Sequence, residues 1–293
     1  MRAIPSRRSI FLGRPLSPLL GATWARNSSG MAYNTPTLGA ELLANNGFAT
    51  DTNWTKDPGW TIGSGVASHT TPTGGIYQVA HSSGNWYQVV FDVVAYTSGN
   101  VYALMGGSSL GPNRSALGTY VQTGRAAGAG SGVGATGTAS VDNVSSKQIT
   151  VSALHAYRLG TSNSQIAAAR ISALTTGTQA GAFALVDNPS NPQNGIYAYH
   201  DGTGVTLDKL VAGTWSNVVS RVTLAFSADM EVMPVPIGGN QWQLWAGGSQ
   251  RGSTVTISDA SIVNNRYYGL FSTYSANLFS GFTLDNQVIP FGF

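Results

Sequence analysis

The chain has 293 residues, of which only 9% are charged while 37 are glycine. This length is sufficient for two domains that each bury a core, and the composition favours strands and turns over solvent-exposed helices. The sequence contains no cysteine, which excludes disulfides, thiol catalysis and cysteine-ligated zinc. No apolar run reaches the roughly 18 residues that a membrane-spanning helix requires, so no membrane insertion is predicted.

The net charge of +3 is unevenly distributed along the chain. The first 40 residues carry five arginines and no acidic residue, whereas the remainder carries 10 basic and 12 acidic residues. A domain that binds nucleic acid spreads basic side chains, interleaved with aromatic ones, over one folded face. The body of the chain has no such cluster. We therefore predict no nucleic-acid binding and assign the charged contacts to an N-terminal arm, residues 1–37.

This arm combines arginines with large apolar side chains. Its segment Ser6–Leu12 is similar to a twin-arginine export signal, but Pro15 and Pro18 interrupt the apolar run that should follow. The favoured interpretation is an anchoring peptide that becomes ordered by docking on another protein, and the alternative is an arm that packs on its own body. The residues predicted to anchor it are Arg7, Arg8, Phe11, Leu12 and Trp24.

The next block, residues 38–152, shows short strand-like segments separated by turns, and no helical period. In chain order these segments are Glu41–Phe48, Trp60–Ile62, Gly75–Gln78, Trp86–Tyr96 and Ser140–Val144. In this order the block resembles the galactose-binding-like jelly roll of carbohydrate-binding modules, a form also found in phage tail and fibre proteins. The resemblance implies an antiparallel β-sandwich that binds carbohydrate.

The segment Trp86–Tyr96 alternates along its length. One face carries the predicted core residues, which are Tyr87, Val89, Phe91 and Val93, and the other carries Trp86, Gln88 and Asp92. A tryptophan beside a glutamine and an aspartate on an open sheet face can stack on a pyranose ring and bind its hydroxyls. Trp86, Gln88 and Asp92 are therefore the candidate carbohydrate site. The alternative is that Trp86 covers the sandwich edge or meets a neighbouring subunit.

The jelly-roll resemblance also implies a structural calcium ion where the opening strand meets the closing strand. Glu41 and Asp142 match the acidic positions, and a hard cation would take their oxygens together with backbone carbonyls. The family often has a second acid beside the closing one, and here that position is Asn143, which counts against the ion. We expect no required cofactor, and the alternative to a calcium site is a pair of ordinary strand-end residues.

The last block, residues 153–293, contains a strong hairpin signal. The segments Ile196–His200 and Val205–Val211 flank Asp201-Gly202-Thr203-Gly204, and Asp-Gly tolerates the positive φ that a tight turn needs. Asp208-Lys209 interrupts the alternation of the second segment and indicates a bulge. His200, at the shoulder of the hairpin, is expected to cap the turn rather than to bind a metal.

Three further features of this block concern burial and strand position. In Gln241–Ala246, Trp242 shares a face with Leu244 and Trp245 shares the other, so one tryptophan is predicted in the core and one exposed or at an interface. Met233-Pro234-Val235-Pro236 is predicted to be edge or linker backbone, because proline cannot donate to a central ladder. The apolar tail Ile289–Phe293 is expected to be buried on a neighbour or on the body.

The order of several motifs in this block is informative. The block contains, in this order, the motifs N-P-Q-N, A-Y-H-D-G-T, V-T-L-D-K-L-V-A-G-T-W, W-Q-L-W, T-I-S-D-A-S-I and Y-G-L-F-S-T. This order resembles the concanavalin A-like (laminin-G-like) sandwich of bacteriophage structural proteins, over about residues 153–289. The resemblance implies a second antiparallel sandwich, so we predict an all-β fold with two tandem sandwiches behind an extended arm.

Motifs that suggest catalysis lack the required context. Gly107–Gly111 fits G-x-S-x-G, but no helix follows it, and Gly132–Gly137 fits a dinucleotide fingerprint but leads into a strand. The four histidines show no metal-ligand spacing. Asp201 and Asp208 are expected to face each other at the hairpin, where an exposed tip gives little pKa perturbation for a glycosidase pair. We predict no enzymatic activity.

Together these features predict a non-enzymatic virion surface protein of a bacteriophage or phage-like particle, such as a fibre, spike or decoration subunit. Its arm would attach to other virion proteins, and its sandwiches would bind host-surface polysaccharide outside the particle. Weak sites would gain avidity from several copies in a homo-oligomer. Two alternatives stay open: a purely structural virion component without glycan binding, and an exported bacterial carbohydrate-binding protein.

Overall fold

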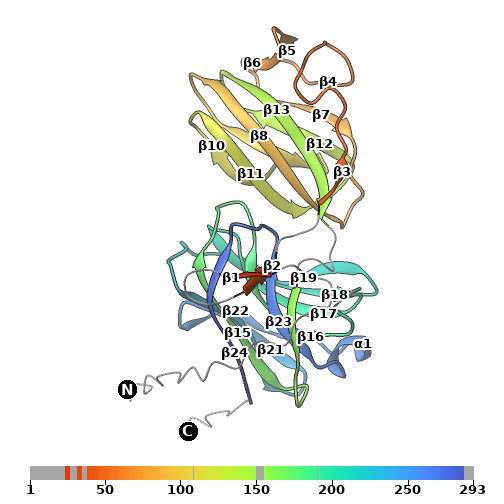
Figure 1. The fold of residues 1–293 in the computed structure, drawn as a ribbon, viewed down its shortest axis with the longest axis vertical. Coiled ribbons are helices and arrows are strands. Elements are labelled where there is room, and N and C mark those ends of the chain that lie inside the picture. The colour runs from red at the N-terminus through yellow and green to blue at the C-terminus, as the bar shows by residue number, and fades with distance from the viewer. Residues whose placement is uncertain are drawn as a thin grey trace.

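The computed structural model describes residues 24–26, 32–34, 38–107, 109–149, 155–189 and 191–286. The regular structure of these residues consists of antiparallel strands and one helical turn, α1 (Ala260–Val263), joined by turns and loops. The strands build two β-sandwiches that stack along the long axis of the molecule (Figure 1). The predicted all-β fold with two tandem antiparallel sandwiches is confirmed. No helix in the described ranges is long and apolar enough to cross a membrane.

The upper sandwich of Figure 1 is built from β3 to β13. One sheet has the order β10-β9-β12-β7-β4, and the other has the order β11-β8-β13-β6-β5 with β3 paired to β13. The strand bounds are β3 (Leu38–Glu41), β4 (Thr55–Lys56), β5 (Trp60–Gly63), β6 (Val66–His69), β7 (Gly74–Val79), β8 (Trp86–Tyr96), β9 (Val101–Met105), β10 (Ser109–Arg114), β11 (Gly118–Arg125), β12 (Gly130–Ala135) and β13 (Ala139–Ile149).

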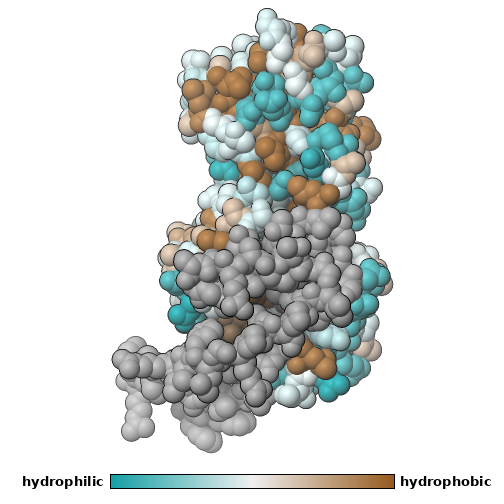
Figure 2. Space-filling model, in the orientation of Figure 1, coloured by the Kyte–Doolittle hydropathy of each residue, from teal (hydrophilic) through white to brown (hydrophobic). Residues whose placement is uncertain are grey.

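The core of the upper sandwich follows the alternation of its strands. β8 has the predicted bounds, and its side chains at Tyr87, Val89, Phe91 and Val93 are at most 2% exposed. They pack with buried residues of both sheets, which confirms the predicted core face of β8. On the visible surface of this sandwich, hydrophobic and hydrophilic residues are interspersed rather than gathered into one apolar patch (Figure 2).

The lower sandwich is built from β14 to β24. Its two sheets have the orders β14-β23-β16-β17-β18-β19 and β22-β21-β20-β15-β24. The strand bounds are β14 (His155–Leu159), β15 (Gln165–Ala173), β16 (Ala180–Val186), β17 (Gly195–His200), β18 (Gly204–Val211), β19 (Thr214–Thr223), β20 (Met230–Gly238), β21 (Gln241–Ala246), β22 (Ser249–Thr256), β23 (Tyr267–Ser272) and β24 (Leu278–Asn286).

Strands β16 and β17 are buried along their whole length because both faces of their sheet are covered. The inner face, with Ile196 and Ala198, packs in the core of the lower sandwich. The outer face, with Tyr197 and Tyr199, packs in a separate cluster that includes Trp86 of the upper sandwich. The sheet therefore has one core beneath it and a second apolar contact above it, at the junction of the two sandwiches.

The predicted hairpin is confirmed by β17 and β18, which pair in register from His200 and Val205. The turn closes with a hydrogen bond of 2.9 Å from the Asp201 amide to the Gly204 carbonyl, and Gly202 has a φ of 96°. The bulge predicted at Asp208-Lys209 is wrong for this strand, because β18 pairs with β17 in unbroken register through both residues. The register shift between Leu207 and Asp208 lies in the pairing with β19, and the extra residue belongs to β19.

The prediction that the proline segment is edge or linker backbone is wrong for the strand as a whole. β20 is an interior strand, between β21 and β15. Its pairing with β15 ends at Val232, however, whereas Pro234 and Pro236 pair only with β21. The prolines thus occupy the part of an interior strand that has one paired side, where a missing N–H donor is tolerated.

The two tryptophans of β21 divide between core and surface as predicted. Trp242 is 3% exposed and packs in the core, whereas Trp245 is half-buried on the opposite face. The indole Nε1 of Trp245 donates a 2.9 Å hydrogen bond to Oε1 of Gln243 on the same face.

Candidate functional site

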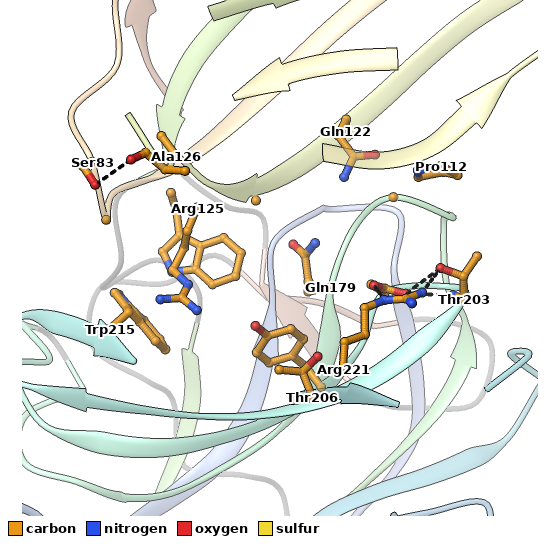
Figure 3. A pocket seen from close by; sticks show the side chains of 17 residues that line it. Ser83, Pro112, Gln122, Arg125, Ala126, Gln179, Thr203, Thr206, Trp215 and Arg221 are labelled. Atoms are coloured by element: carbon orange, nitrogen blue, oxygen red, sulfur yellow. Dashed lines mark hydrogen bonds and ion pairs between the residues drawn. The ribbon is translucent and has the colours of Figure 1, made fainter. Parts of the chain in front are cut away.

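A cavity of about 720 Å³ opens where the two sandwiches meet (Figure 3). In Figure 3, Arg125 and Trp215 lie at one end of the cavity, and Gln122 and Arg221 lie at the other. Gln122 and Arg125 come from β11 of the upper sandwich, whereas Trp215 and Arg221 come from β19 of the lower one. Each sandwich therefore supplies one wall of the cavity.

One side of the cavity is aromatic. Trp86 is 2% exposed, and its ring centroid lies 6.2 Å from that of Tyr199 and 5.6 Å from those of Trp215 and Phe271. All three contacts are edge-to-face, an arrangement that contributes about 0.5–1.5 kcal/mol per pair beyond burial. This cluster packs the two sandwiches together, and Trp86, Tyr199 and Trp215 line the cavity although each is at most 8% exposed.

The prediction that Trp86 lies on an open sheet face is wrong. Trp86 is the first residue of β8, and the lower sandwich covers it there. Gln88 and Asp92 lie farther along β8 and do not line the cavity. Asp92 instead accepts hydrogen bonds from the Thr119 hydroxyl and from Nδ2 of Asn143, at 2.5 and 2.9 Å. The three predicted site residues are therefore not brought together, and only Trp86 belongs to the cavity.

Arg125 crosses the junction to a buried carboxylate. Its Nη2 lies 2.6 Å from Oδ2 of Asp208, and its guanidinium carbon lies 5.9 and 5.4 Å from the ring centroids of Trp86 and Trp215. Asp208 is fully buried, and this burial raises its pKa, an effect that the charge of Arg125 opposes. The Tyr199 hydroxyl donates to Oδ2 of Asp208 at 2.6 Å. Burial raises the pKa of Tyr199 well above its usual value, as does the charge of Asp208, so Tyr199 keeps the donated proton.

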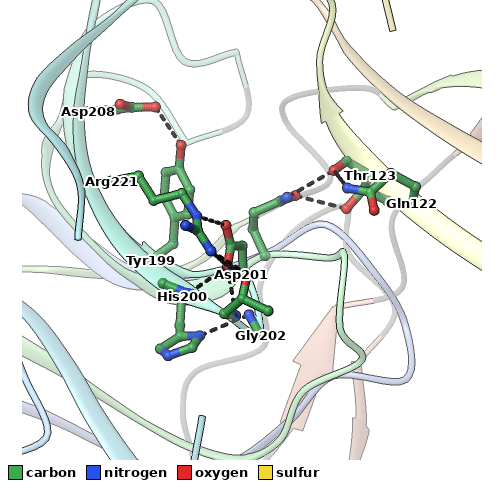
Figure 4. A network of polar contacts seen from close by, with 11 residues as sticks. Gln122, Thr123, Tyr199, His200, Asp201, Gly202, Asp208 and Arg221 are labelled. Atoms are coloured by element: carbon green, nitrogen blue, oxygen red, sulfur yellow. Dashed lines mark hydrogen bonds and ion pairs between the residues drawn. The ribbon is translucent and has the colours of Figure 1, made fainter. Parts of the chain in front are cut away.

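A buried polar network closes the junction beside the cavity (Figure 4). The Thr123 hydroxyl donates to Oε1 of Gln179, and Nε2 of Gln179 donates back to the Thr123 carbonyl, both at 2.8 Å. The Thr273 hydroxyl lies 2.6 Å from that of Thr123. A backbone hydrogen bond of 2.8 Å from Thr123 to the Gly177 carbonyl completes the connection. These mutually satisfied groups fix the relative placement of the two cavity walls.

The hairpin turn forms the far end of the cavity. Arg221 holds Asp201 through two contacts, Nε to Oδ2 at 2.6 Å and Nη2 to Oδ1 at 3.2 Å. Burial tends to raise the pKa of Asp201, but the Arg221 and Thr203 hydrogen bonds bring it below its usual value. Nδ1 of His200 accepts from the Gly202 amide at 2.8 Å, so His200 caps the turn as predicted. Burial lowers the pKa of His200 to about 4, which keeps this nitrogen free to accept.

The indole nitrogen of Trp86 has unused hydrogen-bonding capacity. Its Nε1 is buried and has no partner among the residues that the structure describes. A buried donor left unpaired costs about 1–3 kcal/mol, so such groups in proteins usually meet water or a ligand. Trp86 lines the cavity described above and also a hollow of about 450 Å³ that shares Trp215 with it. This N–H is thus a buried, unpaired donor close to two hollows.

The predicted calcium ligands do not fit a cation. Oε1 of Glu41 accepts from the amides of Leu42, Leu43 and Ser146 at 3.1, 3.0 and 2.9 Å, and Oε2 accepts from the Ser145 hydroxyl. These donors place hydrogen atoms where a cation would have to bind. Within the described ranges, no group of three or more His, Asp or Glu residues could hold a metal ion. Glu41 instead joins β3 to β13, and Asp142 accepts from the Asn143 amide.

The described residues do not form a hydrolytic pair at the hairpin. Asp208 is not at an exposed tip, as we expected, but fully buried and paired with Arg125, while Asp201 is engaged by the turn and Arg221. The G-x-S-x-G match runs into β10, a strand rather than the helix of a nucleophile elbow, and the glycine-rich match begins inside β12.

Most of the predicted anchoring residues, Arg7, Arg8, Phe11 and Leu12, lie outside the described residues, as does the C-terminal tail. Trp24 begins the short strand β1 (Trp24–Arg26), which pairs with β2 (Ala32–Asn34). Strand β2 lies close to β14 and β24 of the lower sandwich. The role of the arm as an anchor stays a prediction.

One feature of the sequence indicates the contact between the two sandwiches, although it does not follow the alternating pattern of a strand with one exposed face. Ala180–Val186 and Gly195–His200 are apolar on both faces, and such runs are typical of strands covered on both sides. They indicate that a second element packs on this sheet, and Tyr199 and Trp215 are the residues that meet it. No local signal identifies Arg125, because its partner is 83 residues away.

Another hollow, of about 490 Å³, is lined by Tyr77 and Tyr102 of the upper sandwich. Burial raises the pKa of Tyr102, as does the charge of Asp57, and Oδ2 of Asp57 is occupied by the Gly75 amide at 2.8 Å. This hollow is smaller than the junction cavity, has no tryptophan and is lined by the upper sandwich alone. The junction cavity is therefore the candidate functional site.

No family model and no curated protein matches the sequence. Among solved structures, sheep galectin-11 in complex with glycerol is similar with a TM-score of 0.33 and 7% identity, over 45% of this chain and 98% of that chain. The carbohydrate-binding module CBM66 from Bacillus subtilis is similar with a TM-score of 0.25 and 10% identity, over 80% of this chain and 93% of that chain. These values are too low to assign a function.

Proposed function

We propose that the protein binds carbohydrate, without converting it, in the cavity between its two sandwiches. The observation that carries this proposal is the lining of the cavity: Trp86, Tyr199 and Trp215 lie beside amide, hydroxyl and guanidinium groups. Aromatic rings offer apolar surface to the C–H groups of a pyranose, while planar polar groups bind its hydroxyls. The volume of about 720 Å³ suits a ligand of a few sugar rings.

Binding without hydrolysis is supported by the state of the carboxylates. A glycosidase needs two carboxyl groups that flank the scissile bond, one to donate a proton and one to attack or to activate water. Asp201 lines the cavity, but its two oxygens accept from Arg221 and the turn. Asp208 is fully buried behind Arg125 and has no path to a ligand in the cavity. Neither group is placed for acid-base work.

For the biological setting, we propose a virion surface protein that is attached through residues 1–37 and binds host-surface polysaccharide. This proposal is supported by the order of strand motifs in both sandwiches and by the basic, apolar arm. An exported bacterial carbohydrate-binding protein is equally compatible with the cavity. Identification of the arm's partner by crosslinking of assembled particles separates the two, since only the first requires virion proteins at the arm.

The burial of Trp86 favours a second candidate function, a purely structural component in which the junction serves only to hold the sandwiches together. Edge-to-face contacts with three aromatic rings are sufficient to explain a tryptophan at this position. The two candidates differ in one respect that can be measured, which is whether the cavity takes up a ligand.

The test is a glycan array with the full chain, followed by titration calorimetry, for the wild type and for Thr206→Tyr. Thr206 lies in β18 opposite Tyr199, lines the cavity and is 8% exposed. A tyrosine there fills the cavity without removing any of the hydrogen bonds between the sandwiches. The matched control is Thr61→Tyr, on an exposed position of β5 in the upper sandwich.

We expect the wild type and Thr61→Tyr to bind the same glycans and Thr206→Tyr to lose at least about tenfold in affinity, or 1.4 kcal/mol. Equal binding by all three proteins would place the site elsewhere. Failure of every protein to bind any glycan, with native melting temperatures, would favour the structural candidate.

A further inference from the structure

We propose that the junction cavity selects neutral glycans over acidic ones, an inference that rests on the proposed function and names its ligand class. The reason lies in the charges of the cavity. Arg125, Asp201 and Arg221 are the charged residues among those that line it, and each already has an ionic partner. An incoming carboxylate or sulfate therefore meets no free cation among the described residues that line the cavity. Arg114 lies beside the lining residue Gly177 but donates to the Thr176 carbonyl at 2.9 Å and is not part of the lining.

The two arginines are held by their partners in ways that leave little charge for a ligand. Arg125 is paired with Asp208, which is fully buried and can neither move into water nor be displaced by a ligand. Arg221 is held through two nitrogens by Asp201, which also accepts from the Thr203 and Gly204 amides. The carboxylate of Asp201 faces the same cavity and repels an anion.

Two neutral groups at the cavity have hydrogen-bonding capacity left. Nε1 of Trp86 is a buried donor without a partner, and the Thr206 hydroxyl makes no side-chain hydrogen bond within the described part of the chain. A donor and a hydroxyl of this kind match sugar hydroxyl groups, which both donate and accept. Neutral hydroxyls can satisfy these groups without disturbing either ion pair.

An acidic sugar would be disfavoured for a physical reason. Its charged group must leave water, and that loss is compensated only by a free, well-placed cation or by several donors. In this cavity the charges of Arg125 and Arg221 are already balanced by Asp208 and Asp201, so an anion that contacts their remaining N–H groups gains little net attraction, and one that displaces either carboxylate leaves it unpaired. Neutral glycans carry no such penalty, and their affinity should be nearly independent of salt, because no charge is screened.

The experiment compares neutral glucan, galactan and mannan oligomers with the C6-carboxylated form of each, by calorimetry on the full chain at about 20 and about 500 mM NaCl. We expect at least one neutral oligomer to bind, its carboxylated form to bind at least about tenfold more weakly, and salt to change the neutral affinity less than about twofold. Tighter binding of a carboxylated form than of its neutral parent would overturn the inference.

A variant that gains affinity for acidic glycans provides the more specific test. Asp208→Asn keeps the shape of the side chain but leaves Arg125 without an opposite charge, so binding of carboxylated oligomers should rise about tenfold and become salt-dependent. The matched control is Asp51→Asn, which removes the same charge from an exposed pair with Lys56 outside the cavity. Should Asp208→Asn fail to fold, Asp201→Asn releases Arg221 and has the same expected effect.

The outcomes separate the two levels of the proposal. In one outcome, the wild type binds neutral oligomers, but neither Asp208→Asn nor Asp201→Asn gains affinity for carboxylated ones. This outcome contradicts the charge argument but leaves glycan binding intact. If no oligomer of either kind binds to the folded wild type, the proposed function is itself wrong and the inference falls with it.

Discussion

Replacing Arg125 by methionine tests what holds the two sandwiches together. Methionine keeps an unbranched chain between Trp86 and Trp215 but removes the charge that faces the fully buried Asp208. Breaking a buried ion pair by removing one partner costs about 3–5 kcal/mol. Because the Arg125 side chain is 22% exposed and Tyr199 still donates to Asp208, we expect the lower end, about 3 kcal/mol at pH 7.

The cost should depend on pH in a defined direction. Burial raises the folded-state pKa of Asp208 above its unfolded value of about 3.9. A group with a raised pKa contributes most to folded stability below its unfolded pKa, and that contribution is lost as the pH rises through the folded pKa. Removing Arg125 raises the folded pKa of Asp208 further. The difference in unfolding free energy between Arg125→Met and wild type should therefore be small below about pH 4 and large at pH 7.

The assay is urea unfolding at both pH values, followed by tryptophan fluorescence, for wild type, Arg125→Met, Asp208→Asn and the double variant. At pH 7 the double variant should lose less unfolding free energy than the two single variants lose together, because it buries no unpaired charge. Arg170→Met is the control, since its partner Glu231 is exposed and such pairs contribute less than about 1 kcal/mol. Equal destabilisation by Arg125→Met at both pH values would refute the electrostatic reasoning and leave packing as the cause.

Three further predictions concern other parts of the fold. Gly132→Ala should lower the free energy of unfolding by about 1–3 kcal/mol in denaturant unfolding, because the new Cβ would lie 2.1 Å from a backbone oxygen of β7. The control Gly63→Ala should change it little, because a Cβ there meets nothing within 4 Å. Burial lowers the pKa of His81 and of His200 to about 4, so the free energy of unfolding should fall as the pH drops from about 6.5 towards 4, and a flat profile in that window would contradict this. Chelation by EDTA should leave the melting temperature unchanged, while Glu41→Ala should lower it by removing the acceptor of three amides.

Local sequence patterns predicted many strands and turns of each sandwich, because these elements depend on interactions between residues that are close in sequence. The bounds of β8, the hairpin turn at Asp201 and the division between Trp242 and Trp245 all follow from side-chain alternation and turn chemistry within a few residues. The cap made by His200 followed from its position beside a turn with a free amide. In each case, the interaction partner is close in sequence.

The site was harder to predict because its partners are distant in sequence. Alternation correctly placed Trp86 opposite the core face of β8, but it cannot tell whether that second face meets water or another sandwich. Asp208 looks like an exposed polar residue near a hairpin and becomes buried only when β11 of the upper sandwich places Arg125 over it. The proline prediction failed for a related reason, because a strand can be interior at one end and unpaired on one side at the other.

The division of the cavity walls between two sandwiches has a consequence for how affinity is set. A ligand that touches both Gln122 and Thr206 binds only when the two walls keep their present separation, so its binding free energy includes the work of holding them there. By thermodynamic linkage, occupancy of the cavity then stiffens the joint, and a substitution of Thr123, which does not line the cavity, alters ligand release through its hydrogen bonds to Gln179. For the proposed ligand, the joint between the sandwiches would thus be a part of the binding site, and its rigidity would contribute to the lifetime of the complex.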